Sequence, residues 1–118
     1  MWEVDLLLDI ILKKLAESKA NDILNIDLSG KSEQVDNMVI ASGTSNRHVS
    51  AIAEKLISNV KTKLGLRVRT EGMSNSDWVL IDCGDVVVHV FREEVREFYQ
   101  LERMWEHNQR TIFDSENV

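Results

Sequence analysis

Three acidic residues lie near a predicted turn in the second half of the chain: Glu71, Asp82 and Asp85. Two or three carboxylates that come together can hold a magnesium ion, because Mg²⁺ prefers oxygen ligands. Asp82 and Asp85 flank the dipeptide Cys83-Gly84, and aspartates are common in turns, where their side chains bond to the local backbone. Since spacing alone establishes no ligand geometry, we favour the turn interpretation and expect neither a metal nor another cofactor.

A second candidate is the segment Gly43-Thr44-Ser45-Asn46, which follows a predicted strand and precedes a predicted helix. Backbone N–H groups at such a helix start can hold a phosphate, because they form a partly positive cluster of donors. Neither the G-x-x-x-x-G-K-S/T nor the G-x-G-x-x-G pattern is present. A plain helix cap by Thr44 or Ser45 is therefore the simpler interpretation.

The remaining reactive side chains are scattered along the chain. His48, His89 and His107 have neither zinc-finger nor H-E-x-x-H spacing. We expect His89 to lie across from Trp78 on a neighbouring strand. Cys83 is a poor candidate nucleophile, because nearby aspartates disfavour a reactive thiolate. The chain is therefore predicted not to be an enzyme.

A β-hairpin is predicted over residues 78–91, with the sequence W-V-L-I-D-C-G-D-V-V-V-H-V-F. A two-residue turn at Cys83-Gly84 would pair Asp82 with Asp85, Leu80 with Val87, and Trp78 with His89. Alternation then gives one aliphatic face, suited to a core, and one face that mixes tryptophan, carboxylates and histidine. Because cysteine is a poor residue for a left-handed turn position, a longer loop and a flipped register remain open.

Trp78 has two interpretations that the sequence leaves open. It is either a core tryptophan, with its N–H bonded to a carbonyl, or a binding anchor, since tryptophans dominate interface hot spots. The mixed composition of its strand face suits a protein partner better than a dry interior.

The other elements predict one α/β domain over residues 1–106, followed by a polar tail over 107–118. The fold is expected to be a single mixed sheet of about five strands with flanking helices, mainly on one face. The unit over residues 38–70 is expected to form a right-handed parallel crossover. The hydrophobic pattern predicts helices over about 3–19, from Thr44 or Ser45 to Gly65 and after Phe91, and strands over 23–28, 38–42 and 66–70.

Composition excludes several classes of function. The chain has 118 residues, a length that suits one domain. Its net charge of −6 disfavours nucleic-acid binding that depends on contacts with phosphates. Such a domain is steered toward a basic partner. One cysteine indicates a reducing cytoplasm. The apolar start over residues 4–12 is too short for a membrane span and is interrupted by Asp5 and Asp9.

Four segments in this order and spacing resemble the ribosomal silencing factor S (Iojap) family. They are A-S-G-T-S-N-R at 41–47, E-G at 71–72, the hairpin at 78–91 and E-V-R-E-F-Y-Q-L-E-R-M-W at 94–105. The resemblance covers about residues 19–105, and the first helix fits it too. Asn37 departs from the aromatic residue often found at that position, which puts a local contact in doubt.

The resemblance implies a fold similar to nucleotidyltransferases without that superfamily's catalytic acids. It implies binding to the large ribosomal subunit through the ribosomal protein numbered fourteen, on the face that meets the small subunit. Subunit joining is then blocked and translation falls when nutrients run short. A homodimer is also implied as a possible state, with little direct nucleic-acid contact and no membrane.

Carried onto this chain, the family motifs give a set of expected partner-binding residues. The hairpin and the loop before it contribute Glu71, Gly72, Trp78, Leu80, Asp82, Gly84 and Asp85. The terminal motif contributes Arg96, Tyr99 and Glu102, for which a structural role is the alternative.

Two other functions remain open from the sequence. The first is a divergent metal-dependent nucleotidyltransferase that uses the Gly43 loop for phosphate and Asp82 and Asp85 for magnesium. It lacks the paired strand aspartates, spaced two apart, that such chemistry usually employs in that fold. The second is a self-associating domain whose mixed strand face is the dimer interface.

Overall fold

The computed structural model describes residues 2–100, without the side chains of residues 2–4 and 99. One five-stranded sheet has the strand order β1-β2-β5-β4-β3. Strands β2 and β5 are parallel, and the other neighbouring pairs are antiparallel, so the predicted single mixed sheet is confirmed. The elements in chain order are α1 (Trp2–Glu17), β1 (Asn21–Asp27), β2 (Asn37–Gly43), α2 (Asn46–Leu64), β3 (Arg69–Glu71), β4 (Trp78–Asp82), β5 (Val86–Arg92) and α3 (Glu93–Tyr99).

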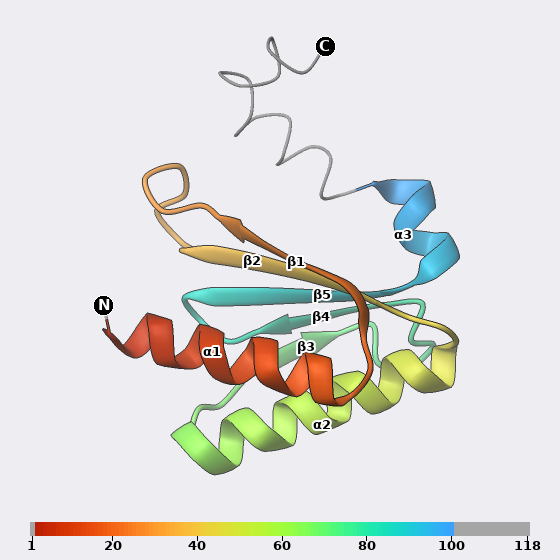
Figure 1. The fold of residues 1–118 in the computed structure, drawn as a ribbon, viewed down its shortest axis with the longest axis horizontal. Helices are drawn as coiled ribbons and strands as arrows, with labels where there is room; N and C mark the ends of the chain where they lie inside the picture. The colour runs from red at the N-terminus through yellow and green to blue at the C-terminus, as the bar shows by residue number, and fades with distance from the viewer. Residues whose placement is uncertain (1, 101–118) are drawn as a thin grey trace, which may run out of the picture.

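Helices α1 and α2 lie side by side on one face of the sheet (Figure 1). The apolar stripe predicted for α2 is buried there, against aliphatic side chains of the central strands. Ser45 caps this helix by accepting the N–H of His48 at 3.1 Å, and Gly65 ends it with a φ of 66°. The fully buried strand residues of this core are Val39, Ala41, Val79, Ile81, Val86, Val88 and Val90.

The second face of the sheet carries a smaller apolar cluster. Ile26, Leu28, Ile40 and Phe91 are buried in it, and Val95 of α3 packs against it. Figure 1 shows α3 beyond one end of the central strands, on the side away from α1 and α2. Within residues 2–100, no helix has the length and apolar character needed to cross a membrane.

The hairpin register predicted from the sequence is wrong by two residues. Strands β4 and β5 pair Trp78 with Phe91, Leu80 with His89, and Asp82 with Val87. The connection is a longer loop over residues 83–85, closed by a hydrogen bond from Cys83 N to Val86 O at 3.0 Å. Only Gly84 adopts a positive φ in this loop, at 93°, so Cys83 does not need the left-handed conformation that disfavours a side chain. A shift of two keeps each side chain on its predicted face.

The third predicted strand is shorter than expected. Only Arg69–Glu71 pairs with β4, whereas residues 66–68 form no strand. Leu66 and Val68 pack against the core after the helix cap at Gly65, so their alternation reflects packing without ladder hydrogen bonds. Strand β3 runs in the direction of β2, but β5 and β4 lie between them. The right-handed crossover expected for the unit over residues 38–70 therefore stays a prediction.

Candidate partner-binding site

Strands β3, β4 and β5 present a mixed face on the side away from α1 and α2. We call it the Trp78 face, and it comprises Arg69, Glu71, Trp78, Leu80, Asp82, Val87, His89 and Phe91. Glu71 lies opposite Leu80 across the β3–β4 pair, so the sheet brings these four predicted residues, Glu71, Trp78, Leu80 and Asp82, onto one surface. Glu71 is exposed, and the side chains of Trp78, Leu80 and Asp82 are half-buried.

Trp78 is held in one orientation by its neighbours on β5. Its Nε1–H donates to Nδ1 of His89 at 2.9 Å, and its ring stacks on Phe91 with centroids 4.7 Å apart. Burial lowers the pKa of His89 to about 4, because an imidazolium is disfavoured away from water. Near neutral pH the imidazole is therefore uncharged, and its Nδ1 is available as an acceptor. His89 is a diagonal neighbour of Trp78 across the strands, where the sequence predicted a directly opposite one.

The structure supports the core interpretation of Trp78 in part, and its role as a binding anchor stays a prediction. One side joins the second apolar cluster through Phe91, and the residue as a whole is half-buried. Its N–H is satisfied by an imidazole nitrogen, where the core interpretation predicted a carbonyl. A rigid aromatic residue that is partly exposed has the properties of an interface anchor.

Gly72 begins the loop that leads from β3 into β4. Its φ is 87°, and a Cβ there would collide with the carbonyl oxygen of Trp78. Only glycine allows this loop to lie so close to β4, which explains why the E-G pair precedes the hairpin in the sequence.

Asp77 is a site residue that the sequence reasoning missed. Its Oδ1 accepts hydrogen bonds from Asn46 Nδ2 at 2.7 Å and from Arg92 Nε at 2.9 Å. These bonds, led by the one from Asn46, lower the pKa of the Asp77 carboxyl. Arg92 also reaches Glu94 Oε2 at 3.2 Å. No local motif signals this network, because Asn46 and Arg92 lie 31 and 15 residues from Asp77 in the chain.

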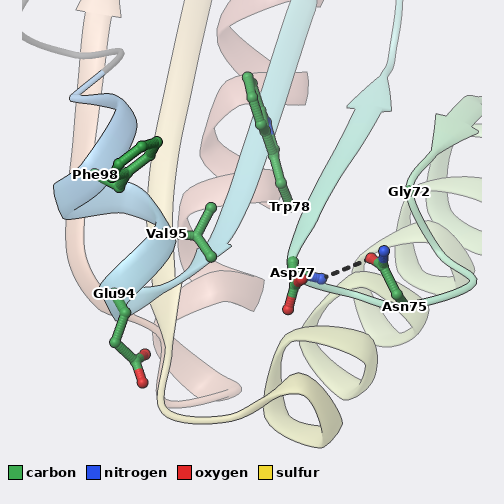
Figure 2. Close-up of a pocket in the computed structure, with 7 residues that line it drawn as sticks. All are labelled: Gly72, Asn75, Asp77, Trp78, Glu94, Val95 and Phe98. Atoms are coloured by element: carbon green, nitrogen blue, oxygen red, sulfur yellow. Dashed lines mark hydrogen bonds between the residues drawn. The ribbon is translucent and has the colours of Figure 1, made fainter.

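A groove of about 520 Å³ lies between this loop and α3. Figure 2 shows Val95 and Phe98 projecting from α3 toward Trp78, with Asp77 and Asn75 on the loop side. Phe98 is 79% exposed, although it follows Val95 at the three-residue spacing of one helix face. A neighbouring hollow is lined by Phe98, Thr44 and three glutamates, Glu93, Glu94 and Glu97. The groove thus combines apolar walls with an acidic rim.

Gly84 and Asp85 lie at the opposite end of β4 from Trp78. Both are exposed, and the carbonyl of Asp85 accepts the N–H of Asp36 at 2.8 Å. They border a separate, largely apolar hollow of about 510 Å³, formed with Leu6, Leu7, Leu64, Leu66 and Cys83. The expected site residues of the hairpin therefore fall on two surfaces, and partner binding through Gly84 and Asp85 stays a prediction.

Arg96 is buried and connects α3 to the sheet. Its Nη1 donates to the carbonyl of Asp22 and to Oγ of Ser42, both at 2.7 Å. These contacts support the structural role left open for the terminal motif, and binding through Arg96 is untested. The side chain of Tyr99 and the whole of Glu102 lie outside the described part of the chain.

The groups considered for catalysis have structural partners. The N–H of Thr44 donates to Nδ1 of His48 at 2.9 Å, so this donor at the helix start is used within the protein. Asp82 Oδ1 accepts the N–H of Gly84 at 2.9 Å, as the turn interpretation predicts. Burial, and then the charge of Asp82, raise the pKa of Cys83 to about 11. Within residues 2–100, no cluster of three or more His, Cys, Asp or Glu has an arrangement able to hold a metal.

Comparisons with known proteins agree with the resemblance carried by the sequence motifs. The family model described as "Ribosomal silencing factor during starvation" matches residues 3–118. The ribosomal silencing factor RsfS of Zymomonas mobilis is 46% identical over 104 residues, covering 88% of this chain and 78% of that protein. A mouse protein named mitochondrial assembly of ribosomal large subunit protein 1 is 34% identical, covering 83% of this chain and 44% of its own length.

The fold also matches a solved structure. A crystal structure of a protein from Chromobacterium violaceum has a TM-score of 0.82 to this chain at 34% sequence identity. The match covers 86% of this chain and 84% of that one.

Proposed function

The chain belongs to the ribosomal silencing factor family, and from this premise we propose that it binds the large ribosomal subunit and blocks subunit joining. The contact is made with the ribosomal protein numbered fourteen, on the face that meets the small subunit. Bound there, the protein lowers translation when nutrients run short. Family membership carries the proposal, and the name of the mouse relative, which refers to the large ribosomal subunit, supports the choice of subunit.

The Trp78 face and the adjoining groove supply the contact surface. The indole of Trp78 is oriented by His89 and Phe91 before any partner arrives. A side chain that is already ordered loses less conformational entropy on binding, which raises affinity. Val95 and Phe98 extend the apolar surface from β4 to α3. Together these residues offer the aromatic centre that interface hot spots require.

Charge selects the class of partner. The chain carries a net charge of −6, and Glu93 and Glu97 line the hollow beside the groove, whereas Asp77 and Glu94 share the charge of Arg92. Ribosomal proteins are typically basic, so the two surfaces attract each other and associate faster. The same negative charge is repelled by RNA phosphates, so contact with ribosomal RNA is minor.

Steric exclusion explains the activity without a chemical step. A domain bound on the joining face occupies the volume that the small subunit needs. The protein then acts as a regulator in the cytoplasm and not as an enzyme. The N–H of Thr44 supports this interpretation, because it donates within the protein and the nucleotidyltransferase alternative would use it for phosphate.

Sucrose-gradient sedimentation of purified ribosomal subunits tests the proposal directly. Added protein is expected to sediment with the large subunit and to raise free subunits at the expense of joined ribosomes. Preformed, translating ribosomes should resist it, because the small subunit already covers the site. Sedimentation with the small subunit, or unchanged joining at saturating protein, would refute the mechanism. A stable dimer that fails to bind subunits would support the self-association alternative.

Trp78→Ala is expected to weaken binding to the large subunit by about 2–4 kcal/mol, the usual loss for a hot-spot anchor. The loss of folding stability should be smaller than the roughly 3–5 kcal/mol of a fully buried tryptophan, because Trp78 is half-buried. Leu12→Ala is the matched control, since Leu12 is also half-buried but lies on α1, across the sheet, and does not line the hollow that Gly84 and Asp85 border. Equal binding by Trp78→Ala and wild type would exclude the Trp78 face as the contact.

A further inference from the structure

Asp77, immediately before Trp78, connects three elements of the fold. Its carboxylate accepts from Asn46 at the start of α2 and from Arg92 at the end of β5. Its backbone carbonyl accepts the N–H of Arg92 at 2.9 Å, and its own N–H donates to Oδ1 of Asn75 at 3.1 Å. Both the side chain and the backbone of Asp77 are therefore fixed, and so is the point where β4 begins.

The same network joins the two sides of the groove. Asn46 Nδ2 also donates to the carbonyl of Asn75 at 2.7 Å, which holds the loop against α2. Arg92 bonds to Asp77 on the loop side and to Glu94 on the α3 side. One arginine thus contacts a residue on each side of the groove.

We propose that Asp77 is a positioning residue, held by Asn46 and Arg92 so that Trp78 and the groove are preorganised for a partner. The inference rests on the proposed function and deepens it, because it assigns a supporting role to Asp77, which borders the groove, and to Asn46 and Arg92, which hold it. Exposed ion pairs contribute little to global stability. The network should therefore act mainly through the geometry of the binding surface.

Two substitutions at one position separate geometry from charge. Asp77→Ala removes the acceptor and should weaken large-subunit binding about fivefold. Asp77→Asn keeps an Oδ1 that can accept from both Asn46 and Arg92, so it should restore most of the affinity. Asp9→Asn is the control, because it removes an exposed carboxylate that pairs with Lys13 on α1. Binding by Asp77→Asn as weak as by Asp77→Ala would overturn the inference in favour of a direct charge contact.

A double-mutant cycle with Trp78→Ala tests whether Asp77 acts through the tryptophan. In the Trp78→Ala background, Asp77→Ala should cause a clearly smaller loss of binding than in wild type, because only the groove is left to position. If the fold-losses of affinity in the two single variants multiply in the double variant, the two residues act independently and the inference is overturned.

A measurement on the free protein keeps the inference separate from the proposed function. By NMR, the Nε1–H of Trp78 should exchange with solvent several-fold faster in Asp77→Ala than in wild type or Asp77→Asn. Unchanged exchange would overturn the positioning role even if ribosome binding is confirmed. Absence of ribosome binding by the wild type, with exchange accelerated as expected, would refute the proposed function and leave the positioning role supported.

Discussion

The five residues of β4 alternate between two faces of the sheet, and these two faces differ in composition. Val79 and Ile81 are fully buried under α1 and α2, whereas Trp78, Leu80 and Asp82 on the other face are half-buried. Strand alternation separates these sets completely, so one strand supplies both the core and the candidate contact surface. We therefore expect stability and the proposed binding to change almost independently when adjacent residues are substituted.

The helix-covered face and the Trp78 face also differ in polarity. The first is aliphatic across β2, β4 and β5, as expected of a surface that stays dry. The second combines aromatic rings with a neutral histidine and, at its edge, the exposed charges of Arg69 and Glu71. This combination resembles the centre and rim of a protein interface more than a core.

Adjacent alanine substitutions give the largest expected difference between the two faces. Ile81→Ala should lower the free energy of unfolding by about 2–5 kcal/mol, because it leaves a cavity at a fully buried position. Leu80→Ala should lower it by only about 1 kcal/mol, since that side chain is only partly buried. Urea denaturation measures both values. Equal losses would contradict the separation of roles.

The elements buried on the helix-covered face were predictable from sequence. The stripe of α2, its cap at Ser45 and its end at Gly65 follow from local periodicity and capping preferences. The aliphatic side of the hairpin follows from alternation, which survives even a wrong register when the shift is two residues. The separation of aliphatic from polar side chains is a strong signal, because exposing an aliphatic side chain that belongs in the core lowers the stability of the fold.

The details of the Trp78 face were less predictable. The hairpin register depended on the length of one loop, and Gly84 rather than Cys83 adopts the positive φ. The bond from Asp77 to Asn46 joins residues that no sequence spacing connects. Phe98 follows a helical stripe, yet it is largely exposed. Polar contacts between distant segments leave no periodic signal, so only the folded chain displays them.

Acid should lower the free energy of unfolding through His89, a residue of the Trp78 face. Burial lowers the folded-state pKa of His89 from 6.5 to about 4. As pH falls below 6.5 the unfolded chain takes up a proton that the folded chain refuses, so stability decreases. The loss ends near pH 4, where the folded state also protonates, and reaches about 3 kcal/mol. Denaturation at several pH values between 7 and 4 measures this slope.

His89→Gln is the control for this titration. Its Oε1 can accept from Trp78 Nε1, but it does not titrate, so the difference from wild type isolates the histidine. The carboxyls with lowered pKa, Asp27 and Asp77, lose their contribution only at lower pH and are common to both proteins. Identical slopes for the two proteins would show that His89 is solvated in the folded state.

The smallest expected effect comes from the loop that supports Trp78. Gly72→Ala should lower the free energy of unfolding by about 1–3 kcal/mol, because alanine is strained at a φ of 87° and its Cβ meets the carbonyl of Trp78. Gly30→Ala is matched in φ, at 83°, but its Cβ would meet nothing within 4 Å. The difference between the two variants therefore measures the close approach of the loop to β4. Gly72→Ala should also weaken large-subunit binding, since relieving the collision moves the start of β4 and the indole with it, whereas Gly30→Ala should bind as wild type. Equal stability and equal binding of the two variants would show that the loop can move without disturbing Trp78.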